Sequence, residues 1–289
     1  MPADAALADP RVTPARPDLA AAHLKGLVQA ARYVEPVARV VCVPVAPVSA
    51  EPDGNARLTT QFLFGERVAV YEAEGQWAWA QAEADGYVGY VPRSCLDDPE
   101  AVGGQAPTHR VAALSTHVYP EPQVKARAVG ALSCGARVAV AATEAGFAVL
   151  AAGGCVPEAH LAPLDTPAAD WVAEAERLRG VPYLWGGRSA AGIDCSGLVQ
   201  LALQSAGRDC PRDSDQQEAA VGGTLESVRA LRRGDLVFWK GHVGVMTSAR
   251  QLLHANIHHM STVEEPLATA RRRIAAAGGG PVTRYARIA

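Results

Sequence analysis

One cysteine of this chain, Cys195, stands where a thiol can be reactive. Asp194 before it is a good N-cap, and apolar residues follow at helical spacing until Gly207 supplies a stop signal. The pattern predicts a helix with Cys195 in its first turn, where the helix dipole and unpaired N–H groups favour a thiolate and can face an oxyanion. Cysteine alone is more often a buried core residue, so catalysis requires a base.

Two histidines downstream can supply that base. Residues 233–239 have the pattern of a turn into a strand and residues 241–246 that of another strand, and His254 lies in the next apolar run. If the hairpin between His242 and His254 centres near Ser248, the two imidazoles are cross-strand partners; a slip of one residue would place them on opposite faces. Taken singly, a strand-end surface histidine and a core histidine are the ordinary interpretations.

Together with Cys195 the histidines make up what thiol acyl transfer requires. Cys195 would attack a carbonyl carbon, and His242 would hold the thiolate as an ion pair and later protonate the leaving amine. His254 would accept a hydrogen bond from His242 and orient it. The order of the three residues therefore predicts nucleophilic catalysis.

Five motifs in this order resemble the successive signatures of the NlpC-type papain-like cysteine peptidases, over about residues 168–266. They are Tyr183-x-Trp185-Gly186-Gly187, Asp194-Cys195-Ser196-Gly197-Leu198, Gly234-Asp235-Leu236-Val237-Phe238, Gly241-His242-Val243-Gly244 and Leu253-His254-Ala255. The resemblance implies an α+β papain-like catalytic domain over residues 165–289, with Cys195, His242 and His254 as its triad. It also implies hydrolysis of the bond between γ-D-glutamate and an L-diamino acid in murein peptides.

The chain before this domain repeats itself. Gly65-Glu-Arg67-Val68-Ala69-Val70 recurs as Gly135-Ala-Arg137-Val138-Ala139-Val140, and both copies contain short alternating runs between turns. The pattern resembles tandem bacterial SH3-like domains, small all-β barrels, over residues 37–98 and 109–164. We expect residues 1–36 to be an N-terminal extension with a short helix near residues 18–25.

The resemblance also suggests residues that contact the substrate. In relatives with this architecture an SH3-like domain reads the free amino terminus of the murein peptide, a role that falls here on Glu66 and Tyr87 together with Asp194. A carboxylate pairs with an ammonium through charge-assisted hydrogen bonds, and a phenol adds direction. The ordinary interpretations are a solvated turn residue for Glu66 and a strand aromatic for Tyr87.

Three further residues lie close to the nucleophile in the chain. Tyr183 and Ser196 can hydrogen-bond the substrate backbone or the developing oxyanion, although packing explains Tyr183 almost as well. Arg212 offers a bidentate fork for the α-carboxylate of D-glutamate. A solvent-facing arginine after a helix is commoner, and we expect that for Arg212.

Composition narrows the function. The 289 residues are 49% hydrophobic with a net charge of −3 and no basic stripe, so we expect neither nucleic acid nor membrane as a partner. The resemblance implies a murein tri- or tetrapeptide as the partner. The six cysteines show no CxxC pair, and the histidines at 254, 258 and 259 have no cysteine or acid at zinc spacing. We therefore expect free thiols and no metal or other cofactor. The oligomeric state is left open.

The first ten residues carry acids and prolines where an export signal would have a basic region and an apolar core, which favours a cytoplasmic enzyme. Such an enzyme would trim imported wall peptides in cell-wall recycling. Two alternatives stay open: an exported endopeptidase acting on intact peptidoglycan, and a noncatalytic peptide-binding protein.

Overall fold

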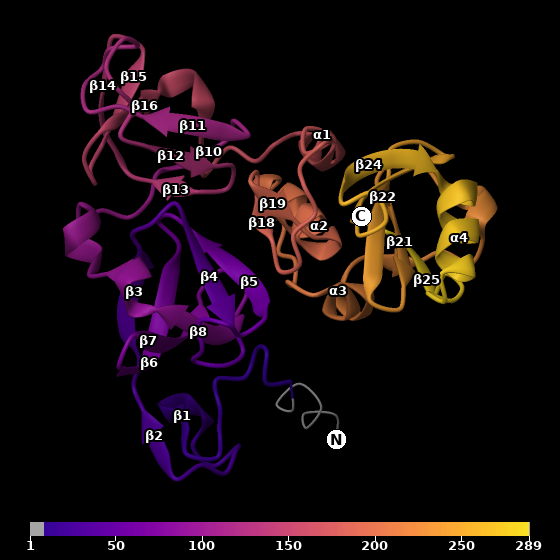
Figure 1. Ribbon diagram of the computed structural model, residues 1–289, viewed down its shortest axis with the longest axis horizontal. Coiled ribbons are helices and arrows are strands. Elements are labelled where there is room, and N and C mark those ends of the chain that lie inside the picture. Colours follow the sequence, from indigo (N-terminus) through magenta and orange to yellow (C-terminus); the bar gives the residue numbers. More distant parts are fainter. Residues whose placement is uncertain (1–8, 289) are drawn as a thin grey trace. The chain divides into compact units, whose positions relative to one another are not determined.

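The structure is a computed structural model that describes residues 9–288, and it divides into two compact units (Figure 1). The first unit ends at Leu164 and the second begins at Asp165, where the sequence predicts the catalytic domain to start. Within residues 9–288, no helix has the length and apolar character needed to cross a membrane. The first eight residues, on which the reading of the export signal rests, lie outside the described residues.

The prediction of a helix near residues 18–25 is wrong for most of these residues. Strand β1 (Leu19–Ala21) pairs in parallel with β2 (Arg32–Val34), and only a single 3₁₀ turn, η2 (Ala22–Leu24), follows. All three residues of β1 are fully buried, and Leu19 packs in a cluster with Tyr71 and Trp79. This long-range burial outweighs the local helical preference of the alanine-rich segment.

Residues 37–97 form one antiparallel seven-stranded sheet in the order β5-β4-β8-β7-β6-β3-β9. Its strands are β3 (Val37–Val41), β4 (Val45–Ser49), β5 (Leu58–Leu63), β6 (Arg67–Glu74), β7 (Trp77–Ala82), β8 (Val88–Pro92) and β9 (Leu96–Asp97), with the 3₁₀ turn η3 (Arg93–Cys95) before β9.

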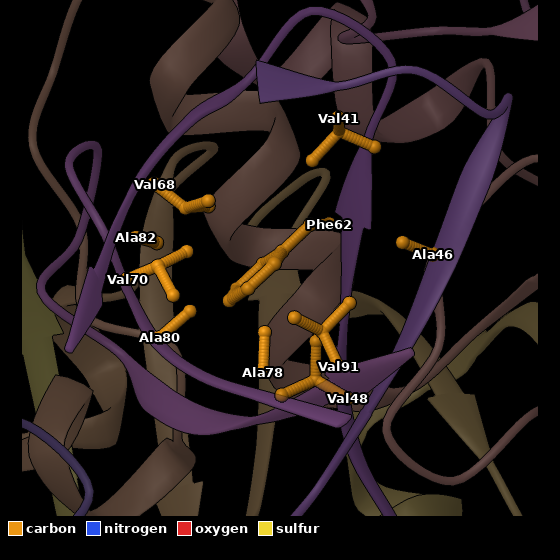
Figure 2. Packing of buried hydrophobic residues seen from close by; sticks show 10 residues of the cluster. All are labelled: Val41, Ala46, Val48, Phe62, Val68, Val70, Ala78, Ala80, Ala82 and Val91. Carbon is orange, nitrogen blue, oxygen red and sulfur yellow. The ribbon is translucent and has the colours of Figure 1, made fainter. Parts of the chain in front are cut away.

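The core of this sheet is built from one aromatic ring and many small side chains. Phe62 lies among valines and alanines from the surrounding strands (Figure 2). Ala78, Ala80 and Ala82 alternate along β7 into this core, as the period of two in the sequence predicts. The alternating runs are therefore confirmed as strands.

The second copy of the repeat forms three smaller sheets, β13-β10-β17, β11-β12 and β14-β15-β16, after the 3₁₀ turn η4 (Pro99–Val102). The elements are β10 (His109–Val111), β11 (Ser115–Val118), β12 (Gly130–Ser133), β13 (Arg137–Val138), β14 (Val140–Glu144), β15 (Phe147–Leu150), β16 (Cys155–Pro157), η5 (Glu158–His160) and β17 (Leu161–Pro163).

Corresponding turns of the two copies have the same backbone hydrogen bonds. The Gly65 N–H donates to the Val41 carbonyl at 2.9 Å, and the Gly135 N–H donates to the Val111 carbonyl at 3.0 Å. Both glycines have a positive φ, 76° and 84°, which side chains disfavour. The repeated sequence thus forms the same turn twice, while an SH3-like second copy stays a prediction.

The second unit has the α+β composition expected of it. Its six-stranded sheet has the order β20-β25-β21-β22-β23-β24, with α2 packed against β22 and β23 and α4 packed against β23 and β24 (Figure 1). The elements are α1 (Trp171–Glu176), β18 (Arg188–Ser189), β19 (Gly192–Ile193), α2 (Cys195–Ser205), α3 (Ser214–Ala220), β20 (Gly223–Thr224), η6 (Val228–Ala230), β21 (Asp235–Trp239), β22 (His242–Met246), β23 (Gln251–Asn256), β24 (Ser261–Pro266), α4 (Leu267–Ala276) and β25 (Arg284–Arg287).

The turn at Gly65 generates a stability prediction. A Cβ atom at Gly65 would lie 1.9 Å from the carbonyl oxygen of Arg137, whereas at Gly75, which also has a positive φ, it would meet nothing within 4 Å. We expect Gly75→Ala to lower the free energy of unfolding by about 1–2 kcal/mol through backbone strain. Gly65→Ala adds a backbone collision and should cost about 3 kcal/mol or more. Urea denaturation measures both, and equal losses would contradict the role of the Arg137 contact.

Candidate active site

The predicted helix start is confirmed. Cys195 is the first residue of α2, and the N-cap residue Asp194 accepts a hydrogen bond from the Gly197 N–H at 2.7 Å. Every residue of α2 from Cys195 to Leu203 is buried. The apolar pattern of the helix therefore fixes it in the interior, and the cap fixes where its first turn begins.

Opposing effects act on the pKa of the Cys195 thiol. Burial, and next the charge of Asp194, raise the pKa of Cys195 to about 12. The backbone N–H groups of Val243 and Ser196 hydrogen-bond to the sulfur and act in the opposite direction, as does Arg212. The helix start favours the thiolate as expected, whereas desolvation favours the protonated thiol, so the ion pair of Cys195 with His242 stays a prediction.

The two histidines lie on one face of the sheet in a register that differs from simple cross-strand pairing. Val245 pairs with Leu253, so the turn centres one residue beyond Ser248. Moving the centre by one residue changes the pairing by two residues, so Gly244 lies opposite His254 and the two histidines stay on the same face. His242 is then the diagonal neighbour of His254 on the same face. The His242 Nε2 and His254 Nδ1 atoms are 2.8 Å apart, within hydrogen-bond distance.

Burial disfavours the charged form of both imidazoles. Burial, and then the neighbouring His254 ring, lower the pKa of His242 to about 3. Burial also lowers the pKa of His254, which is fully buried, although the hydrogen bond with Glu265 opposes that shift. Removal from water disfavours the charged form of each ring, so His242 is available as a base.

Sequence reasoning missed Glu265. Its Oε1 lies 2.9 Å from His254 Nε2, and the Arg273 guanidinium of α4 forms an ion pair with the same oxygen. These hydrogen bonds, that of His254 foremost, lower the pKa of Glu265 to about 2. Only the pairing of β23 with β24 shows that Glu265 lies near His254. Leu252 is opposite Glu265 in this pairing, and His254 is the diagonal neighbour of Glu265.

A buried ion pair supports the start of α2. Arg212 is 1% exposed, and its two terminal nitrogens donate to Asp194 Oδ1 at 3.0 Å and Oδ2 at 2.7 Å. The expectation of a solvent-facing arginine is therefore wrong, because the Asp194 carboxylate inside the fold requires a charged partner. Asp194 also accepts from the Gly186 N–H at 2.9 Å, so its carboxylate already has several donors.

The other predicted contact residues have different surroundings. The Ser196 hydroxyl donates to Asp194 and accepts from Arg212 at 2.9 Å. Burial, and then the neighbouring Cys195, raise the pKa of Tyr183, so the phenol keeps its proton near the nucleophile. The structure thus brings Tyr183, Asp194 and Ser196 together around Cys195, and their roles toward a substrate stay predictions.

Glu66 and Tyr87 belong to the first unit. Glu66 is buried and its Oε2 accepts from the Leu63 N–H at 2.9 Å, while the Tyr87 N–H donates to Asp85 at 3.0 Å. Their role in binding an ammonium also stays a prediction. Within residues 9–288, no group of three or more His, Cys, Asp or Glu side chains is arranged to hold a metal ion.

Gly244 allows the two histidines to meet. A Cβ atom there would lie 2.8 Å from Leu252 Cδ1 and 3.2 Å from His254 Cβ. We expect Gly244→Ala to lower the free energy of unfolding by about 1–3 kcal/mol through overpacking and to shift the imidazole NMR signals of His254. Gly223→Ala is the control, because a Cβ atom there meets nothing within 4 Å. Unchanged stability and spectra in Gly244→Ala would refute the packing argument.

The buried ion pair generates a second prediction for this unit. Arg212→Met leaves the Asp194 carboxylate buried without its cation, so the free energy of unfolding should fall by about 3–5 kcal/mol in urea denaturation. Adding Asp194→Asn removes the orphaned charge and should restore part of that loss. Arg271→Met on the exposed side of α4 is the control. If Arg212→Met matched that control, the ion pair would not support α2.

Comparison with known proteins agrees with this geometry. Residues 180–273 match the NlpC/P60 family and residues 48–96 match the bacterial dipeptidyl-peptidase SH3 domain. The γ-D-glutamyl-L-lysine dipeptidyl-peptidase of Bacillus subtilis is 28% identical over 221 residues, which cover 68% of this chain and 72% of that protein. Dipeptidyl-peptidase 6 of Lysinibacillus sphaericus is 26% identical, over 75% of this chain and 87% of that protein.

Protein P54 of Enterococcus faecium is 41% identical over 90 residues, but these cover 29% of this chain and only 17% of that protein. Among solved structures, an NlpC/P60 family protein from Bacillus cereus superposes with a TM-score of 0.74 at 21% identity, over 87% of this chain and 99% of that one. This likeness shows the fold. The chain therefore carries an N-terminal SH3-like domain and, after it, a papain-like α+β domain of the NlpC/P60 cysteine peptidase family, a family of hydrolases.

Proposed function

We propose that this protein hydrolyses the γ-D-glutamyl-L-diamino acid bond of murein peptides that carry a free N-terminal L-alanine. One observation carries the proposal. His242 is hydrogen-bonded to His254 at 2.8 Å, and the N–H of the next residue, Val243, faces the Cys195 sulfur. These contacts support the assignment of Cys195 as nucleophile, His242 as base and His254 as the group that orients the base for acyl transfer. The name of the Bacillus subtilis relative, a γ-D-glutamyl-L-lysine dipeptidyl-peptidase, supports the choice of bond.

The proposed reaction uses each group in turn. Cys195 Sγ attacks the γ-carbonyl carbon of D-glutamate while His242 takes the thiol proton. When the C–N bond breaks, His242 gives that proton to the leaving amine of the diamino acid, and a thioester remains. Water then attacks the thioester, His242 takes a proton from it, and the departing Cys195 sulfur regains a proton as the free acid leaves. The protonated phenol of Tyr183 is a donor for the oxyanion.

Selection for a free amino terminus is assigned to Glu66 and Tyr87, with Asp194. Because Arg212 already neutralises Asp194, the charge that attracts the ammonium comes chiefly from Glu66. A buried carboxylate would lose this partner when the alanine is acylated, and the loss of a hydrogen bond to a charged group is worth about 1.5–3 kcal/mol. This preference would exclude stem peptides that are still amide-linked to muramic acid.

A role in recycling follows from that selectivity, since free-ended peptides are fragments and not intact wall. We place the reaction in the cytoplasm. The six cysteines are all free, and a reducing compartment keeps Cys195 in its thiol form.

The test compares the wild-type protein with its variants on peptides whose amino terminus is free or acetylated. Wild type, Cys195→Ala and the control Cys210→Ala, which removes another buried thiol of the same unit, each receive L-Ala-γ-D-Glu-meso-diaminopimelate with a free or an acetylated amino terminus. Mass spectrometry should show the dipeptide L-Ala-γ-D-Glu only from the free peptide, and none with Cys195→Ala. Glu66→Gln should reduce the preference for the free peptide about ten- to a hundredfold.

Other outcomes would change the assignment. Equal cleavage of both peptides, or release of peptides from intact cross-linked murein, would favour a wall-acting endopeptidase. Binding without cleavage by wild type would favour a peptide-binding protein. The lysine-containing peptide, run in parallel, shows which diamino acid is preferred.

A further inference from the structure

Behind the two histidines lies a continuous line of polar groups within the second unit. His242 Nε2 meets His254 Nδ1 at 2.8 Å, His254 Nε2 meets Glu265 Oε1 at 2.9 Å, and Arg273 binds the same carboxylate. The His254 side chain is fully buried and that of Glu265 is 11% exposed. Water therefore competes little for these hydrogen bonds, and each donor must find its acceptor within the line.

The carboxylate decides which nitrogens carry protons. An ionised carboxylate only accepts hydrogen bonds, so His254 Nε2 must carry a proton and donate it to Glu265. A neutral His254 then has a bare Nδ1, which accepts, and the donor in the next bond must be the Nε2–H of His242. A neutral His242 with its proton on Nε2 has a bare Nδ1. The ring nitrogen that is not engaged by His254 is thus left as the proton acceptor.

We propose that Glu265, held by Arg273, is a positioning residue that sets the tautomers of both histidines and so leaves His242 Nδ1 unprotonated for the Cys195 thiol. The catalytic use of this nitrogen rests on the proposed function. When His242 Nδ1 takes the thiol proton, every other hydrogen bond in the line keeps its direction. The negative charge of Glu265 then stabilises the imidazolium through His254, as a buried carboxylate does behind a catalytic histidine.

The wild-type protein provides the first test. Long-range ¹H–¹⁵N spectra of histidine-labelled protein, assigned with His242→Gln and His254→Gln, distinguish protonated from bare ring nitrogens. We expect His254 and His242 both to show a protonated Nε2 and a bare Nδ1. A protonated Nδ1 on either ring of the substrate-free protein would overturn the proposal. These spectra require no substrate, so they decide the tautomers even if the peptide of the proposed function is not cleaved.

Variants at Glu265 provide the second test. Glu265→Met removes the acceptor, so the tautomers become mixed and kcat should fall about a hundredfold with KM nearly unchanged. Glu265→Gln keeps an oxygen that can accept from His254 Nε2 and should recover most of the wild-type tautomer and an intermediate kcat. Wild-type kcat in Glu265→Met would overturn the proposal, and so would a rise in KM without a fall in kcat.

Glu264→Met is the matched control. Glu264 is the preceding residue of β24, its side chain points to the other face, and it binds Arg179 at 2.9 Å. We expect its spectra and kcat to match those of wild type. Circular dichroism and thermal unfolding confirm folding of each variant; if Glu265→Met does not fold, the wild-type spectra and Glu265→Gln decide the question.

Discussion

The catalytic unit depends on the carboxylate of Asp194, which joins three segments of the chain. Its oxygens accept from the Gly197 N–H inside α2, from the Gly186 N–H of the preceding loop and from both terminal nitrogens of Arg212. A buried carboxylate is costly unless such donors surround it, so the position of each segment is tied to the others. Cys195 is the next residue, and its backbone therefore has little freedom to move.

In the proposed reaction a proton passes between two buried groups, the Cys195 thiol and the His242 imidazole. Burial disfavours the thiolate of Cys195 and the imidazolium of His242 alike. In the proposed reaction, charge develops when the thiol attacks. At that moment the N–H groups at the start of α2, the Val243 N–H and the ionised Glu265 favour the separated charges.

The first unit gains its rigidity in another way. Its core holds small side chains around Phe62, and at Gly65 a glycine with a positive φ allows the backbone of Arg137 to pass close by. Close packing of this kind leaves little room for side-chain rearrangement. Such a scaffold suits residues such as Glu66 and Tyr87, whose proposed task requires a fixed position.

Local patterns in the sequence were sufficient for the elements that bear the chemistry. Some features depend only on residues that are neighbours in the chain, so they can be predicted from the sequence without the tertiary structure. They are the N-cap at Asp194, the alternation in β7 and the repeated turns at Gly65 and Gly135. The resemblance of five motifs to the NlpC-type peptidases predicted Cys195, His242 and His254 as a triad, and the structure brings His242 within hydrogen-bond distance of His254. The expected helix near residues 18–25 failed because burial in β1 overrode a weak local preference.

Only the tertiary structure decided the rest. The register that makes His254 a diagonal partner of His242, the burial of Arg212 against Asp194 and the position of Glu265 behind His254 all arise between segments distant in sequence. The protonation of Cys195 depends on how far it is removed from water, which no local pattern reports. The sequence by itself therefore determined which residues are available for the chemistry. Packing and desolvation determined which of them meet and in which protonation state.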